Sequence, residues 1–232
     1  MGAKIGMSNV RMSNRKFGMY AGGENYGGEI YAWDHQTLGM GDKNETVFGG
    51  GLTLGYDFDK RPDIPVRIEL DYTARDKSSR SGSVGATWDV TRDGNPDVII
   101  NTVDMKTSVQ LQTLMLNAWF DIPTGTAFRP YLGGGIGWAF IDFSASSLED
   151  GIPSSLVSTG TKSSTNFAWS LGGGLGYAIT RNWTADLGYR YIDAGNVKKE
   201  PLKFPDGSAS LYYSKIGRIE AHDVMLGIRY TF

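Results

Sequence analysis

The sequence predicts an all-β fold, an eight-stranded antiparallel up-and-down β-barrel that spans a membrane. Three observations lead to this prediction. Apolar and polar residues alternate with a period of two in several segments, short and long connections alternate along the chain, and aromatic residues lie near the segment ends. Together these features are typical of a barrel whose outer face meets lipid and whose interior is filled by side chains.

The composition of the chain narrows its class before any strand is placed. Its 232 residues include 32 glycines and 12% aromatic residues, a mixture that favours short strands and turns over helices. The mean hydropathy of -0.28 and the lack of a long apolar run exclude a helical membrane span. Because the net charge is -2 and the basic residues are scattered, nucleic acid is not an expected partner. Cysteine is absent, so neither a disulfide nor a thiolate metal site is expected.

The strands are placed where the alternation occurs. It is cleanest in residues 66–75, 183–192 and 223–232. We expect further strands at residues 46–58, about 108–120, 128–142 and 167–179, and the first strand near residues 15–24. The barrel domain is then predicted to cover residues 15–232, with residues 1–14 as a periplasmic segment or the start of the first strand. Residues 1–6 lack the apolar stretch of a secretory signal, so we expect a mature or trimmed form.

The polar faces of the three cleanest strands carry charges of balanced sign. A soluble sheet would expose such a face to water, whereas a narrow barrel would enclose it, and enclosed charges need partners. The balance favours the barrel, and the small residues on one face of residues 167–179 would leave room for bulky charges. The predicted lumen charge network is Arg67, Glu69, Asp71, Arg75, Asp186, Arg190, Asp223 and Arg229.

The lengths of the connections predict the topology. Residues 60–64, 123–126 and 181–182 form tight turns, whereas the connections at about 25–45, 77–106, 144–165 and 194–220 are long and polar. Short periplasmic turns and long external loops are the pattern of outer-membrane barrels, so the outer membrane of a Gram-negative-type bacterium is the expected location. Within the second long loop, the two segments around Gly94 are expected to form a hairpin above the bilayer.

Aromatic girdles are expected at both membrane interfaces, because amphipathic rings prefer headgroup depth. The girdle near the short turns is predicted to contain Tyr56, Phe58, Trp119, Phe120, Phe128, Tyr177, Trp183, Tyr230 and Phe232. The girdle toward the long connections is predicted to contain Phe48, Tyr72, Phe140, Phe143, Phe167 and Trp169.

Three segments carry a resemblance to a known family, namely RPYLGGGIGW at 129–138, LGYRYID at 187–193 and HDVMLGIRYTF at 222–232. From about residue 46 to its end the chain resembles the small outer-membrane β-barrels of the opacity-protein and Omp25-like type, related in architecture to the transmembrane domain of OmpA. The resemblance implies roles in adhesion, surface interaction or envelope integrity, and it transfers no catalytic residue. Tyr230 and the terminal Phe232 resemble the signal by which the outer-membrane assembly machinery recognises its clients.

Motifs that could carry chemistry have simpler explanations. The triple-glycine runs are followed by neither a helix pattern nor the Gly-Lys-Ser/Thr of a phosphate loop. The turn at 93–97 has oxygen ligands at alternate positions, but Val98 stands where a calcium loop requires glycine. His35 lies in the first long loop, and alternation is expected to separate His222, facing the lipid interface, from Asp223 in the lumen.

The fourth long loop holds the candidate binding residues. Exposed aromatic side chains among cations can bind anionic sugars, lipopolysaccharide or a protein partner. The alternative is a mobile, solvated loop or strand extensions above the membrane. The candidates are Lys198, Lys199, Lys203, Phe204, Tyr212 and Tyr213.

These features predict a surface-exposed protein that acts in adhesion or surface interaction through its extracellular loops. A structural envelope-integrity barrel is the alternative, followed by a narrow pore and a lipid-modifying outer-membrane enzyme. The expected partners are outer-membrane lipid and lipopolysaccharide, the assembly machinery, and a host or surface protein or glycan. No catalytic residue, cofactor or metal is predicted.

Overall fold

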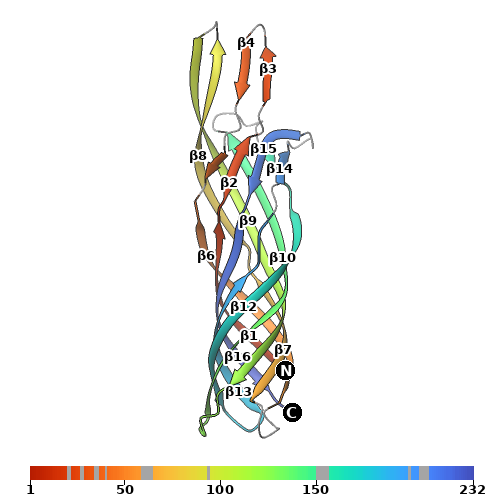
Figure 1. Ribbon diagram of the computed structural model, residues 1–232. Coiled ribbons are helices and arrows are strands. Elements are labelled where there is room, and N and C mark those ends of the chain that lie inside the picture. Colours follow the sequence, from red (N-terminus) through yellow and green to blue (C-terminus); the bar gives the residue numbers. More distant parts are fainter. Residues whose placement is uncertain are drawn as a thin grey trace.

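The chain forms a closed antiparallel β-barrel (Figure 1). The computed structural model describes residues 1–19, 22–26, 29–33, 37–39, 41–58, 65–92, 95–149, 157–197, 200–203 and 209–232. In these ranges the wall consists of β1 (Gly2–Ser13), β6 (Lys43–Asp57), β7 (Val66–Arg75), β9 (Asn95–Asp121), β10 (Phe128–Glu149), β12 (Lys162–Ala178), β13 (Trp183–Asp193) and β16 (Arg218–Tyr230). Each pairs with the next in this order, and β16 pairs with β1 to close the ring. This part of the chain contains no helix long and apolar enough to cross a membrane.

Seven of the eight predicted wall strands are confirmed, and the position of the first one is wrong. The first wall strand is β1, whereas residues 15–24 overlap β2 (Lys16–Met19) and β3 (Gly22–Tyr26), which lie above the barrel (Figure 1). The alternation of β1 is faint because only Ile5 and Met7 give its outward face large apolar side chains before Asn9. Its backbone is nevertheless paired along both edges.

The long connections contain further strands that raise the wall above the barrel. The predicted hairpin is confirmed: β8 (Ser78–Arg92) pairs with β9 out to the register Arg92↔Asn95. β15 (Ala209–Lys215) lies between β14 (Glu200–Lys203) and β2. The short strands are β4 (Glu29–Trp33), β5 (Thr37–Gly39) and β11 (Val157–Ser158). Both chain ends lie at the opposite, short-turn end (Figure 1).

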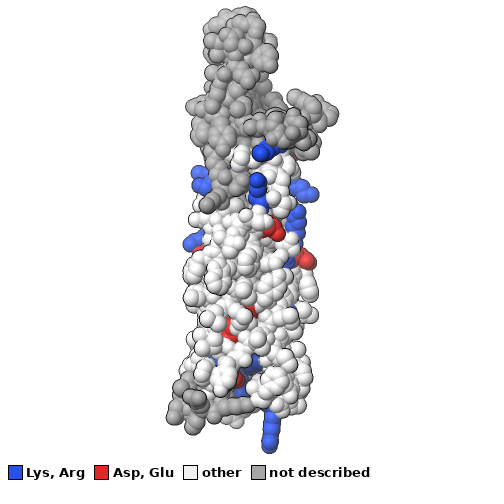
Figure 2. Space-filling model, turned by 90° about the vertical axis from the view of Figure 1, so that its right-hand side faces the viewer, with Lys and Arg blue, Asp and Glu red and all other residues white. Residues whose placement is uncertain are grey.

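The outer face of the barrel is apolar, as the alternation predicts. Residues such as Leu52, Leu132, Leu171 and Leu226 are all more than half exposed. Figure 2 shows one side of this wall, which is mostly uncharged, with basic side chains gathered toward its upper end. One residue of each predicted girdle is placed wrongly, because Trp119 and Phe143 point inward and are only 7% and 1% exposed.

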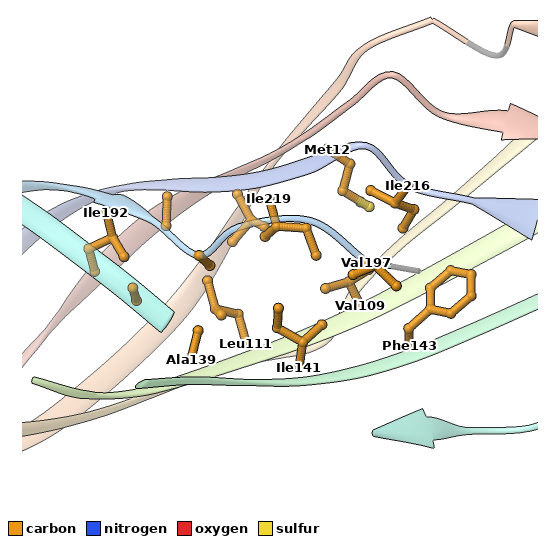
Figure 3. Packing of buried hydrophobic residues seen from close by; sticks show 14 of the residues in the cluster. Met12, Val109, Leu111, Ala139, Ile141, Phe143, Ile192, Val197, Ile216 and Ile219 are labelled. Atoms are coloured by element: carbon orange, nitrogen blue, oxygen red, sulfur yellow. The ribbon is translucent and has the colours of Figure 1, made fainter. Parts of the chain in front are cut away.

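The interior has two halves of different chemistry. The half near the short turns holds charged side chains, whereas the half near the long connections holds an apolar core (Figure 3). In Figure 3, Met12, Leu111, Ile141, Ile192 and Ile219 converge from five different strands. The sequence predicted charges and small residues along the lumen but not this apolar core.

Glycines on β10 allow the close approach of β9. A Cβ added at Gly137 would lie 2.1 Å from the carbonyl oxygen of Leu114 on the neighbouring strand. At Gly133 it would lie 2.0 Å from the carbonyl oxygen of Ala118. These distances are far below van der Waals contact, so the triple-glycine region of β10 serves wall packing.

Candidate functional site

An upper charged layer lies directly below the apolar core and contains three cations and two carboxylates. Arg75 Nη2 lies 2.7 Å from Asp223 Oδ2, and Arg190 Nη2 lies 3.1 Å from the same oxygen. Arg190 Nη1 lies 2.9 Å from Asp71 Oδ1, and Lys4 Nζ donates to Asp71 Oδ2. Both carboxylates are at most 2% exposed, so the layer is screened from water by the wall.

Hydroxyl groups complete the hydrogen bonding of this upper layer. Ser8 donates to Asp223 Oδ1 at 2.7 Å and accepts from Arg75 Nε at 3.0 Å. Thr73 donates to Asp71 Oδ1 at 2.8 Å. A buried charge is tolerated only when it is both paired and hydrogen-bonded, and this layer satisfies both conditions.

A lower charged layer lies nearer the short turns and is held more loosely. Arg67 Nε is 3.2 Å from Glu69 Oε1, and Arg67 Nη2 is 3.5 Å from Asp121 Oδ1. Arg229 Nη2 is 3.7 Å from Asp186 Oδ1, and Arg229 Nη1 is 4.0 Å from Glu69 Oε1. Several of these nitrogen and oxygen atoms are buried without a hydrogen-bond partner.

Aromatic side chains and a cavity accompany the lower layer. Trp119 Nε1 donates to Glu69 Oε2 at 3.0 Å, and Arg67 lies over the Tyr131 ring at 5.1 Å from its centroid. A cavity of about 90 Å³ touches both charged layers, and a second cavity of about 270 Å³ adjoins it beside the chain termini. Buried polar atoms that lack a hydrogen bond, such as Arg67 Nε, lie beside these cavities and fit bound water.

The structure separates the eight predicted lumen charges into these two layers. Arg75, Arg190, Asp71 and Asp223 lie in the upper layer, whereas Arg67, Glu69, Asp186 and Arg229 lie in the lower one. The prediction missed Lys4, because it precedes the expected first strand, and Asp121, because it ends a strand whose polar face was not considered. The inward alternation of β1 and β9 would have revealed both.

The candidate binding residues of the fourth long loop differ in where they lie and in how exposed they are. Lys198, Lys199 and Phe204 lie outside the described residues, as does the side chain of Tyr212. Lys203 is exposed on β14. Tyr213 is only 5% exposed, so its prediction as an exposed anchor is wrong. The physical reason is that β15 is paired on both edges as part of the raised wall, which encloses one of its faces.

Ion pairs lie on the outer face of the wall just above the apolar band. Arg218 Nη2 lies 2.9 Å from Asp193 Oδ2, and Arg11 Nη2 lies 2.6 Å from Asp42 Oδ2. The Arg11 guanidinium and the Asn14 N–H donate to Asp42 and hold the pKa of its carboxyl below the ordinary value. Glu220 lies between the two arginines, at 3.9 Å and 4.0 Å.

His222 and the predicted girdle residues Tyr230 and Phe232 lie near opposite ends of β16. His222 is bonded to the Tyr189 hydroxyl at 2.7 Å on the outer face while Asp223 is buried, so their expected separation is confirmed. At the other end, the rings of Tyr230 and Phe232 lie 5.0 Å apart, and Trp183 lies 4.9 Å from Tyr230. Among the described residues, no group of three or more His, Asp or Glu side chains could hold a metal ion.

Comparisons with known proteins agree with this architecture. Residues 6–232 match the family model described as the outer membrane protein beta-barrel domain. Outer membrane protein PagN of Salmonella typhimurium is 36% identical over 198 residues, which are 85% of this chain and 77% of PagN. "Putative adhesin RC1281" of Rickettsia conorii is 25% identical over 132 residues, 56% of this chain and 51% of that protein. The solved structure of Neisserial surface protein A covers 99% of this chain and 97% of its own, at 17% identity and a TM-score of 0.44.

Proposed function

Because this chain belongs to the outer membrane protein β-barrel family, we propose that it is a surface protein that acts in adhesion through the raised wall and loops at its long-connection end. The observation that carries the proposal is that the lipid-facing wall and the lumen of the barrel are already occupied. The lower wall presents apolar side chains to lipid, and the lumen is filled by two charged layers and an apolar core. In the part of the chain that the structure describes, this arrangement leaves the region above the apolar band to contact another cell.

The similarity to a Rickettsia protein named as an adhesin supports the same class of function. We propose a host or surface protein or glycan as the adhesive partner, the assembly machinery as the receptor of the Tyr230 and Phe232 signal, and lipopolysaccharide as a neighbour in the membrane. We also propose that the chain is not an enzyme. The envelope-integrity barrel is the competing function, while a pore is disfavoured because an ion would meet the buried charges and then the apolar core.

The test removes the fourth connection without opening the barrel. Ala194 N donates to Ile219 O and Ile219 N donates to Gly195 O, both at 2.9 Å, so the two ends of the excision already lie side by side. Replacing residues 198–215 by a short Gly-Ser turn keeps Ile216 in the apolar core. Loop closure entropy changes slowly with length, so insertion and heat-modifiable gel migration should be retained.

A matched control excises residues 84–103 from the β8–β9 hairpin, where the register Ser83↔Asp104 leaves a paired base. Bacteria carrying each variant are measured for adhesion to cultured epithelial cells. We expect the 198–215 excision to reduce adhesion and the control to retain it. If both shortened barrels adhere like the parent while loss of the whole protein makes the envelope leak, the scaffold function replaces the adhesive one.

A further inference from the structure

A basic cleft lies on the outer face of the molecule, just above the apolar band. It has a volume of about 880 Å³, and its cations come from the ends of β1, β2, β15 and β16. We define the basic cleft by these four cations, Arg11, Lys16, Lys215 and Arg218. Along the part of its lining that the structure describes, Glu220 is the only acid, and the amides of Asn14 and Asn196 add hydrogen-bonding groups.

The two lysines of the basic cleft face each other, while the two arginines have acidic partners. Arg11 and Arg218 are paired with Asp42 and Asp193, as described above. Lys16 and Lys215 are directly opposite in the β2–β15 register, both are exposed, and neither forms an ion pair within the described part of the chain. Like charges in directly opposite positions destabilise a strand pair. An anion between them would reverse that repulsion.

The height of the basic cleft follows from the alternation along β1 and β16. On β16 the outward residues are apolar from Ile228 to Val224 and polar from His222 to Arg218. On β1 the same change falls between Met7 and Arg11. At the same level the inward residues change from polar to apolar, because the apolar core begins there. The lipid-facing wall therefore ends directly below the basic cleft.

The rise of the strands per residue places the upper end of the apolar band at the same level. A tilted strand rises about 2.6 Å per residue along the membrane normal, so an apolar band about 25 Å tall takes about ten residues. Counted from the girdle residue Tyr230, the band ends near Glu220. Arg218 then lies at headgroup depth, and Lys215 lies about 8 Å farther out.

We propose that the basic cleft binds the phosphate groups of an outer-leaflet glycolipid. The cleft opens sideways at the level of the lipid headgroups rather than at the tip of the molecule, and Tyr189, Tyr191 and His222 form an aromatic interface directly below it. Arg11 and Arg218 meet the headgroup phosphate at its own depth, while the flexible side chains of Lys16 and Lys215 reach down to it from above. The proposal rests on the outer-membrane location and not on the adhesive role.

The test titrates the full-length chain, in zwitterionic detergent micelles, with diphosphorylated lipid A. A second titration uses the same lipid A after removal of both phosphates, and thermophoresis measures the two affinities. The variant K16E/K215E reverses both lysines, and K77E/K106E is the matched control on two exposed lysines outside the basic cleft. Each lysine near an anionic surface is worth about fivefold in affinity, so reversing both should weaken the binding of phosphorylated lipid A by at least about 25-fold. The control should stay within about threefold of the parent.

The outcomes separate this proposal from its competitors. Equal affinity of the parent for phosphorylated and dephosphorylated lipid A, or an unchanged affinity of K16E/K215E, overturns it. A third titration uses a heparin oligosaccharide: a loss confined to heparin assigns the basic cleft to a soluble sulfated glycan and also overturns it. If K16E/K215E fails to show heat-modifiable migration, the neutral variant K16Q/K215Q replaces it, with an expected loss of about 25-fold. Cell adhesion by the point variants, which keep the fourth loop, shows separately whether the adhesive function stands.

Discussion

The upper charged layer predicts a large cost for neutralising Asp223. The carboxylate accepts four hydrogen bonds, from Ser8 at 2.7 Å, from Arg75 at 3.1 Å and 2.7 Å, and from Arg190 at 3.1 Å. In the variant Asp223→Asn, three cations share the single carboxylate of Asp71, and the new amide group points a donor at a guanidinium. Removing one member of a buried ion pair typically costs about 3–5 kcal/mol. We expect the free energy of unfolding to fall by about this amount.

The measurement is a denaturant titration of the barrel in lipid vesicles, followed by tryptophan fluorescence. The matched control is Arg11→Gln, because the Arg11–Asp42 pair has a similar separation of 2.6 Å but its two side chains are 44% and 47% exposed. Exposed ion pairs contribute about 0–1 kcal/mol, so the control should change stability by less than about 1 kcal/mol. If both variants lower the free energy of unfolding by the same amount, the charges of the upper layer are hydrated rather than enclosed.

Three further predictions test the wall and the interior with the same titration. Leu226→Arg places a charge on the 62% exposed lipid face and should cost about 2–4 kcal/mol, whereas Met225→Leu, inside the barrel, should cost less than about 1.5 kcal/mol; the reverse order would overturn the assignment of the two faces. Gly137→Ala puts a methyl group 2.1 Å from the Leu114 carbonyl oxygen and should cost about 1–3 kcal/mol, and an unchanged stability would show that the two strands can separate freely. Arg15→Met should be neutral or stabilising, because the Arg15 guanidinium is buried with two nitrogens that lack hydrogen bonds, and a loss above about 3 kcal/mol would reveal an anionic partner.

The sequence predicted best where alternation was strong on both faces. The bounds of β7, Val66–Arg75, are those expected from the sequence, because large apolar residues on one face alternate with charged residues on the other. β1 was missed because Gly2, Ala3 and Gly6 give its alternation little amplitude, although Lys4 on its inward face belongs to the upper charged layer. The apolar core was missed because the phase of the alternation inverts near His222, and an inverted phase looks like the end of a strand.

The partners of the charges could not be read from the sequence. Charge balance indicated that Arg190 needs a carboxylate, with Asp186, Glu69 and Asp71 as candidates on sequence grounds. In the structure Arg190 reaches Asp71 and Asp223, while Asp186 lies near Arg229. Which inward residues meet depends on the stagger between strands when the sheet closes, and stagger is a property of the whole ring rather than of any segment.

The same distinction applies to the candidate binding surfaces. A period of two determines which side chains face out and which face in, because successive residues of a strand point to opposite faces. That local rule was enough for the barrel, its lipid-facing wall and its outer-membrane location. The basic cleft joins residues about 200 positions apart in the sequence, Arg11 with Arg218 and Lys16 with Lys215. It exists only because β16 pairs with β1 and β15 with β2. Long-range pairing of this kind is decided by closure of the sheet, so only the tertiary structure could place these four cations on one surface.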